Sequence, residues 1–136
     1  MSRDFDIVVV GAGPAGLAAA TAAANLGKRV AVLDDNPKPG GQIWRAGIHP
    51  DPHPDRAKAR AIAAFHASRA ELFSGYQVVN AAGPGSLDAW VESTKTLESF
   101  TCEKLILATG ARELFLPFPG WTLRSEERRV GKECRP

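Results

Sequence analysis

Apolar residues recur along the first part of this chain with two different periods, and the change of period marks its structural elements. The apolar run at 6–10 predicts a strand, and the alanine-rich stretch at 14–26 predicts a helix that ends before Gly27. A second short apolar run, at 29–33, predicts another strand. A strand, a helix and a strand within about 30 residues predict two parallel strands joined by a right-handed crossover.

The segment after the second strand predicts a long loop followed by a helix. Residues 36–54 are rich in proline and glycine and show little periodicity, which favours a loop. Over 55–73, apolar residues return at three- and four-residue spacing, with Ile62, Phe65 and Leu72 on one face. This spacing predicts a helix over 55–73 with its basic residues toward solvent.

The rest of the chain predicts further stretches of sheet. A strand at 76–80 is followed by a turn at 82–85, and 89–98 favours one or two short antiparallel strands. The apolar run at 104–108 predicts a buried strand that leads into small residues. Because strands and helices alternate at the amino-terminal end, the chain is predicted to adopt an α/β fold with a parallel sheet.

A glycine motif lies between the first predicted strand and the first predicted helix. Gly11, Gly13 and Gly16 form the pattern G-x-G-x-x-G. In such a unit the first glycine permits a tight turn, the second lets a pyrophosphate approach the backbone, and the third lets the helix pack against the sheet. The free N–H groups and positive dipole end of the helix then face the phosphates. The complete unit predicts a dinucleotide site; the alternative is a tight structural turn.

Two aspartates follow the second predicted strand. Asp34 stands where a carboxylate can accept hydrogen bonds from both hydroxyls of an adenosine ribose. An acid at this position also repels a 2′-phosphate, which argues against NADP in this site. Asp35 is predicted to point away, because side chains of a strand alternate between faces. The alternative for Asp34 is a solvated residue at a strand end.

Two further segments place small residues next to predicted strands. Residues 39–45 read P-G-G-Q-I-W-R, and paired glycines there allow a planar ligand to lie against the backbone. Residues 105–111 read L-I-L-A-T-G-A, so small side chains at the end of a strand would let phosphates or a sugar approach the sheet. Taken singly, the first could be a flexible loop and the second any buried strand with a turn.

Composition sets limits on this interpretation. The 136 residues are 44% hydrophobic, which is enough for the core of one small domain. No apolar stretch is long enough to span a bilayer, and the first residues do not resemble a secretory signal, so a cytoplasmic protein without a transmembrane segment is expected. Cys102 and Cys134 form no disulfide framework, and Cys102 is predicted to be a packing residue. The three histidines lack the spacing of metal ligands, so no metal site is predicted.

The net charge of +2 comes from the end of the chain. Residues 124–136 hold a cluster of Arg, Lys and Glu, while the rest is formally neutral, so no attraction to nucleic acid is predicted. Residues 124–135 resemble a translated sequencing adapter. We interpret 124–136 as a non-native tail and 1–123 as the amino-terminal portion of a dinucleotide-binding domain that continues in the natural protein. The alternatives are a basic interaction tail and a short amphipathic helix.

Three segments in this order resemble the two-dinucleotide-binding-domain flavoproteins of the pyridine nucleotide–disulfide oxidoreductase superfamily. They read V-V-V-G-A-G-P-A-G-L-A-A-A, G-G-Q-I-W-R and L-I-L-A-T-G-A. Within the superfamily, P-G-G-Q-I-W-R and A-T-G-A-R-E-L-F-L-P-F-P-G-W-T-L are most similar to the FAD subunits of opine oxidase and hydrogen cyanide synthase, and to sarcosine oxidase α-type proteins. The resemblance covers Phe5 to about Leu123.

The resemblance implies a Rossmann-like FAD-binding domain, truncated, with FAD as its cofactor. The glycine turn would hold the pyrophosphate, Asp34 the adenosine ribose, and 41–42 the flavin-side half. The backbone at Val78 would contact adenine, and 109–111 match a second FAD-binding segment. The residues that the resemblance assigns to the cofactor are Gly11, Gly13, Pro14, Ala15, Gly16, Asp34, Gly41, Gln42, Val78, Thr109, Gly110 and Ala111.

The resemblance also implies a reaction class. Disulfide reductases of the superfamily carry a cysteine pair just after the paired glycines, whereas 42–45 contain none, so dithiol chemistry is not expected from this segment. We expect a flavin-dependent oxidoreductase that oxidises an amine or amino-acid-like C–N bond and passes electrons to a partner subunit or acceptor; no catalytic residue is identified. The alternatives are an NAD(P)H-dependent FAD reductase of the same superfamily, an NAD-binding module, and a non-catalytic dinucleotide-binding scaffold.

Overall fold

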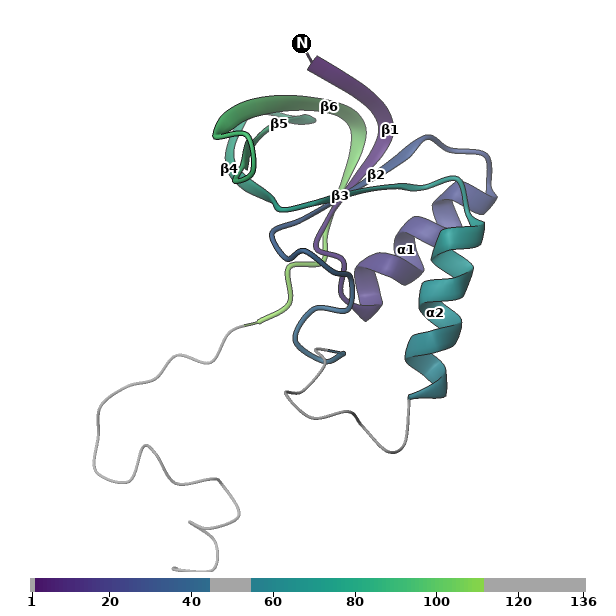
Figure 1. The fold of residues 1–136 in the computed structure, drawn as a ribbon. Coiled ribbons are helices and arrows are strands. Elements are labelled where there is room, and N and C mark those ends of the chain that lie inside the picture. The colour runs from purple at the N-terminus through teal and green to yellow at the C-terminus, as the bar shows by residue number, and fades with distance from the viewer. Residues whose placement is uncertain (1, 45–54, 112–136) are drawn as a thin grey trace, which may run out of the picture.

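The computed structural model describes residues 2–44 and 55–111, which form one mixed sheet with helices on one face (Figure 1). The strand order across the sheet is β3-β2-β1-β6-β5-β4. The elements within these residues are β1 (Ser2–Val10), α1 (Pro14–Asn25), β2 (Val30–Asp34), α2 (Arg56–Ala67), β3 (Glu71–Ser74), β4 (Tyr76–Gly83), β5 (Ser86–Val91) and β6 (Thr96–Leu107).

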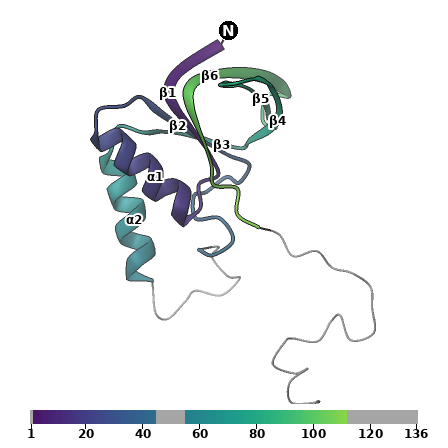
Figure 2. The same ribbon diagram turned by 180° about the vertical axis from the view of Figure 1, so that it is seen from behind.

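The predicted α/β fold with a parallel sheet is confirmed on the side of the sheet that contains β3, β2, β1 and β6. These four strands pair in parallel, β1 with both β2 and β6, and β2 with β3. The chain moves outward from β1 to β2 to β3 through α1 and then α2, so right-handed crossovers place both helices on the same face. Figures 1 and 2 show α1 and α2 side by side on that face.

The other side of the sheet is antiparallel. β4 pairs with β5, and β5 pairs with the first half of β6, Thr96 to Thr101. The same long β6 then runs parallel to β1 as far as Leu107. The antiparallel strands predicted over 89–98 are confirmed, as the end of β5 and the start of β6. The separate strand predicted at 104–108 is corrected, because it is the end of one continuous β6, which joins the two parts of the sheet.

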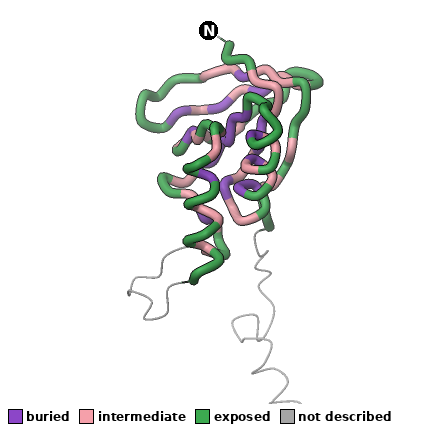
Figure 3. The backbone as a smooth tube through the Cα atoms, turned by 90° about the vertical axis from the view of Figure 1, so that its right-hand side faces the viewer, coloured by how far each residue is buried: buried purple, intermediate pink, exposed green. Residues whose placement is uncertain are grey.

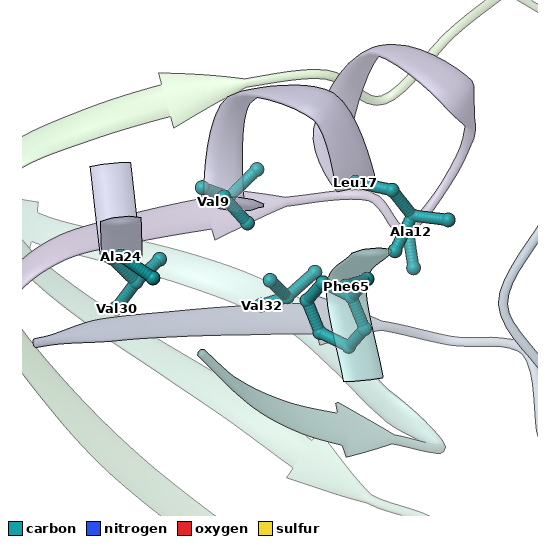
Figure 4. Close-up of a cluster of buried hydrophobic side chains, with 8 residues drawn as sticks. Val9, Ala12, Leu17, Ala24, Val30, Val32 and Phe65 are labelled. Carbon is teal, nitrogen blue, oxygen red and sulfur yellow. The ribbon is translucent and has the colours of Figure 1, made fainter. Parts of the chain in front are cut away.

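Two hydrophobic clusters pack against the opposite faces of the central strands. One lies under the helices, where Val9 and Val32 meet Leu17 and Phe65 (Figure 4). The other lies on the far face, where Val8 and Leu33 meet Phe100. Neighbouring residues of β1 and of β2 thus point into different clusters, which is why both strands read as continuous apolar runs. Figure 3 shows the buried segments gathered in the middle of the described residues, with exposed backbone around them.

The predicted helix over 55–73 is wrong at its carboxyl end. Helix α2 begins after its N-cap Asp55 and ends at Ala67, and Ser68 caps it with extended backbone. Residues 71–74 form β3, which pairs with β2. The two adjacent side chains Leu72 and Phe73 pack into different hydrophobic clusters. A strand buries adjacent residues on opposite faces, and the edge of β2 selects that conformation here.

The prediction that 104–108 is a buried strand is also corrected. Leu105 is 39% exposed and Leu107 is 71% exposed. β5 pairs with β6 only as far as Thr101, so no described strand lies along the outer edge of β6 after that point. The other predicted strands differ only at their ends: β1 begins at Ser2, β2 covers Val30–Asp34, and β4 runs on to Gly83.

Candidate dinucleotide site

A cleft of about 710 Å³ opens at the carboxyl ends of β1, β2 and β6, next to the start of α1. In open α/β sheets, ligands bind in the crevice outside the carboxyl ends of the strands. Three segments far apart in sequence meet there, together with part of β4. The residues that line the cleft are Val10, Gly11, Gly13, Pro14, Ala15, Leu33, Asp34, Asp35, Asn36, Gly41, Gln42, Ile43, Tyr76, Gln77, Val78, Ala108, Thr109, Gly110 and Ala111.

The three motif glycines differ in what surrounds them. A Cβ on Gly11 would lie 2.4 Å from the Ala108 carbonyl oxygen, and Gly11 has φ +104°. A Cβ on Gly16 would lie 1.8 Å from the Gly11 carbonyl oxygen, so Gly16 packs beneath the turn and does not line the cleft. Around Gly13 a Cβ would meet nothing within 4 Å. The turn is therefore compact below and open on the cleft side at Gly13.

The first turn of α1 offers donors to the cleft. Gly13 is the N-cap residue, no side chain caps the helix, and the first turn has no acidic residue. Pro14 occupies the first helical position, where its missing N–H costs nothing. The N–H groups of the first turn have no partners within a helix. Together with the dipole, they make this end of α1 suited to an anion such as a diphosphate.

Asp34 is the only buried charged side chain among the described residues, at 7% exposure. Its Oδ2 accepts a hydrogen bond of 2.5 Å from the Ala12 N–H. Its Oδ1 accepts from the Asn36 N–H at 2.8 Å and from Asn36 Nδ2 at 2.9 Å. The carboxylate thus ties the end of β2 to the glycine turn and to the following loop.

The prediction that Asp35 points away from the site, made from the alternation of strand side chains, is wrong. It is exposed, lines the cleft, and accepts a hydrogen bond of 2.7 Å from Asn36 Nδ2 at its Oδ1. β2 ends at Asp34, so the alternation no longer governs the next residue. The end of β2 therefore presents two carboxylates to the cleft.

The paired glycines of the next loop rest against the glycine turn. The Gly40 N–H donates to the Ala12 carbonyl at 2.8 Å. A Cβ on Gly41 would lie 3.1 Å from the Gly13 Cα, so the two glycine backbones approach each other closely. Gln42 follows in the cleft wall with an exposed side chain.

The start of β4 forms another wall of the cleft, with Tyr76, Gln77 and Val78. The Tyr76 hydroxyl donates to Glu98 Oε1 at 3.2 Å, and Arg3 pairs with the other oxygen of Glu98 at 3.0 Å. Burial of the phenol raises the pKa of Tyr76 above its ordinary value, and the negative charge of Glu98 raises it further. The Tyr76 ring also packs edge-on against Phe73, with ring centroids 5.4 Å apart.

Eleven of the twelve residues predicted to contact a cofactor line this one cleft, and Gly16 supports it from below. Sequence reasoning missed Asp35, Asn36 and Tyr76. The sequence could have predicted that Tyr76 lines the cleft, because it lies two residues before Val78 and so shares the same face of the strand. Asn36 had none, because its position depends on the path of the loop.

The described residues carry neither a metal-binding cluster nor a membrane-spanning helix. In residues 2–44 and 55–111, no group of three or more His, Cys, Asp or Glu side chains is placed to hold a metal ion. No helix in those ranges is long and apolar enough to cross a membrane. His49 and His53 lie outside the described residues, as do 112–123 and the proposed tail at 124–136. Cys102 packs against the second hydrophobic cluster, as predicted.

The fold and the cleft define a dinucleotide-binding α/β protein, and comparison with known proteins supplies the family. The family model described as "pyridine nucleotide-disulphide oxidoreductase" matches residues 5–135. The chain belongs to this family, which implies a flavin-type cofactor.

Two curated relatives and one solved structure show how far the similarity extends. The chain is 40% identical to a subunit of opine oxidase from Agrobacterium tumefaciens, over 90% of this chain and 27% of the relative. It is 34% identical to the HcnB subunit of hydrogen cyanide synthase from Pseudomonas protegens, over 85% of this chain and 26% of the relative. The L-proline dehydrogenase structure from P. horikoshii shares the fold with a TM-score of 0.66 at 18% identity, over 85% of this chain and 24% of that one. The chain therefore spans about a quarter of the length of these relatives.

Proposed function

We propose that this chain forms the FAD-binding part of a cytoplasmic flavin-dependent oxidoreductase that oxidises an amine or amino-acid-like C–N bond and passes electrons to a partner subunit or acceptor. The observation that carries the proposal is the meeting of three separate motif segments around one cleft. Their convergence is what one extended ligand requires. Three unrelated turns would have no reason to face the same space.

The residues present fit the adenosine diphosphate half of FAD. The space beside Gly13, where a Cβ would meet nothing, leaves room for a diphosphate against the backbone. The uncapped first turn of α1 would donate N–H groups to it. Asp34 lines the same cleft and would accept a ribose hydroxyl, and Val78 would face the adenine.

The flavin half would lie along 41–42 and 109–111. These residues line the cleft, and the small side chains of 109–111 leave room beside the backbone. When bound, FAD would supply the two-electron redox chemistry, while the protein binds and orients it. No described residue is assigned as a catalytic acid or base.

The substrate class and the partner rest on the relatives. Proteins named as subunits of opine oxidase and of hydrogen cyanide synthase are 40% and 34% identical to this chain over the matched residues. Both names denote subunits, which supports a partner in electron transfer. Anaerobic addition of amino acids and secondary amines to the FAD-loaded full-length gene product tests this part. Bleaching of the flavin absorption supports it, and a failure of every amine to bleach the flavin argues for another substrate or for a scaffold.

The cofactor proposal is tested on the chain itself by titration with FAD, FMN and NAD, monitored by flavin fluorescence and by calorimetry. We expect FAD to bind more tightly than FMN, because FMN lacks the adenosine diphosphate that the cleft fits. NAD is expected to compete weakly. Binding of NAD without binding of FAD would favour the nicotinamide module instead.

A further inference from the structure

The Asp34 carboxylate is already engaged in the ligand-free fold. A carboxylate has about four acceptor positions on its two oxygens. The Ala12 N–H occupies one position on Oδ2, and the backbone and side-chain N–H groups of Asn36 occupy two on Oδ1. One position therefore remains, so Asp34 can accept one ribose hydroxyl without breaking a bond, and not both.

The residue that Asp34 holds is the middle of the glycine turn. Ala12 is fully buried, and both of its backbone polar groups are bound. Its N–H donates to Asp34, and its carbonyl accepts from the Gly40 N–H at 2.8 Å. The turn between Gly11 and Gly13 is thus clamped on one side by the end of β2 and on the other by the loop of paired glycines.

The clamp also decides which donors face the cleft. The Ala12 N–H is directed to Asp34 and is not available to a phosphate. The Gly13 N–H has no hydrogen-bond partner among the described residues. A turn held in this way presents the Gly13 N–H and the first turn of α1 without reorganisation on binding, which favours affinity.

On the basis of the function proposed above, we infer that Asp34 is a positioning residue for the diphosphate. It acts through the Ala12 N–H to fix the glycine turn, and this contribution is independent of the sugar hydroxyls. Asp35 lines the same cleft with an exposed side chain and does not share the role, because the Ala12 N–H is already donated to Asp34.

The test compares ADP with 2′,3′-dideoxy-ADP, which keeps the diphosphate and lacks both ribose hydroxyls, by calorimetry on the full chain. Asn in place of Asp34 has one acceptor oxygen and one amide donor, so it cannot accept from Ala12 on one side and Asn36 on the other. We expect Asp34→Asn to weaken the binding of dideoxy-ADP about tenfold. The binding of ADP should be weakened by at least as much, because Asp34 can also accept a ribose hydroxyl. If Asp34→Asn weakens the binding of ADP but not of dideoxy-ADP, the inference is overturned, because Asp34 would then act only through the sugar.

Asp35→Asn is the matched control, since it removes the same charge one residue further on. Removing a negative charge beside a diphosphate strengthens its binding by Coulomb's law, so charge alone predicts tighter binding in both variants. We expect Asp35→Asn to bind dideoxy-ADP at least as tightly as the wild type. If Asp35→Asn reproduces the full loss seen in Asp34→Asn, the inference is wrong.

Amide hydrogen exchange measured by NMR tests the clamp without any ligand. We expect the Ala12 amide to be protected in the wild type and to exchange about tenfold faster in Asp34→Asn, with the Val9 and Val32 amides unchanged. An unprotected Ala12 amide in the wild type overturns the inference even if the variant fails to fold. Failure of the proposed function has a different signature, in which the clamp is present and neither ADP nor FAD binds.

Discussion

Single residues in the glycine turn have separable structural and binding roles. Gly16 is in contact with the Gly11 carbonyl, whereas the space beside Gly13 is empty. The two positions belong to the same motif, yet a methyl group has opposite consequences at each. This difference gives a matched pair of substitutions within one turn.

Gly16→Ala is expected to lower the free energy of unfolding by about 3 kcal/mol, because its Cβ would lie 1.8 Å from a backbone oxygen that cannot move freely. Gly13→Ala is expected to cost less than about 1 kcal/mol, the cost of a poorer N-cap residue. It should nevertheless abolish most FAD binding, because its methyl group occupies the proposed diphosphate space. Urea denaturation and FAD titration of both variants measure this, and equal stabilities would contradict it.

Tyr76 is the only tyrosine in the chain, so its ionisation can be followed alone by ultraviolet absorbance. Its raised pKa predicts a phenol midpoint above the ordinary value of about 10. The associated stability is fully present below that ordinary pKa and is lost as the pH rises through the higher folded value. Glu98→Gln should lower the midpoint, because it removes the neighbouring negative charge. A wild-type midpoint at the ordinary value would show that the phenol is not buried beside Glu98.

At the scale of elements, β3 shows how a neighbouring strand overrides a local pattern. The spacing of Ile62, Phe65 and Leu72 is helical, but the chain leaves α2 at Ala67 and pairs with β2 from Glu71. Ser68 assists this exit, since its hydroxyl donates to the Phe65 carbonyl at 2.6 Å. Forming a strand here buries Phe73 on the sheet face opposite the helices, where its ring packs against Phe5, Tyr76 and Phe100.

Phe73→Ala tests the burial of β3. Phe73 is 8% exposed and packed against three aromatic rings, so its loss should cost about 3 kcal/mol or more in unfolding free energy. Leu97→Ala, at a residue that is 57% exposed, is the control and should cost less than about 1 kcal/mol. If the two substitutions lower the unfolding free energy by similar amounts, Phe73 is not in the core, and the assignment of 71–74 to a buried strand is contradicted.

For the whole molecule, the apolar side chains left at the surface predict its behaviour in solution. Leu107 is 71% exposed on the outer edge of β6, with Leu105 at 39% on the same strand. Among the described residues no strand lies along this edge after Thr101, and a strand edge with apolar side chains favours self-association.

Leu107→Lys is therefore expected to reduce self-association of the chain, measured by sedimentation velocity over a range of concentrations. Leu26→Lys is the matched control, because Leu26 is 82% exposed and caps the end of α1, so it does not belong to a strand. Lys at this control position should have the smaller effect. A monomeric wild-type chain, or equal effects of the two substitutions, would contradict the role of the β6 edge.

The sequence alone determined the β-α-β unit and two parts of the cleft, the glycine turn and Asp34. The reason is local: a G-x-G-x-x-G turn constrains strand, turn and helix within about 30 residues. The resemblance then assigned 41–42, Val78 and 109–111 to the same cofactor site, and in the structure these residues line the cleft.

Only the tertiary structure decided the end of α2, the continuity of β6 and the orientation of Asp35. Each of these depends on a partner outside the local pattern: β2 for β3, β1 and β5 for β6, and the Asn36 loop for Asp35. The role inferred for Asp34 belongs to the same group. Its carboxylate bonds to Ala12, 22 residues away, and that bond depends on how β1 and β2 lie side by side. The spacing of apolar residues indicates the type of each element and its apolar face, whereas pairing between distant segments decides what each residue contacts.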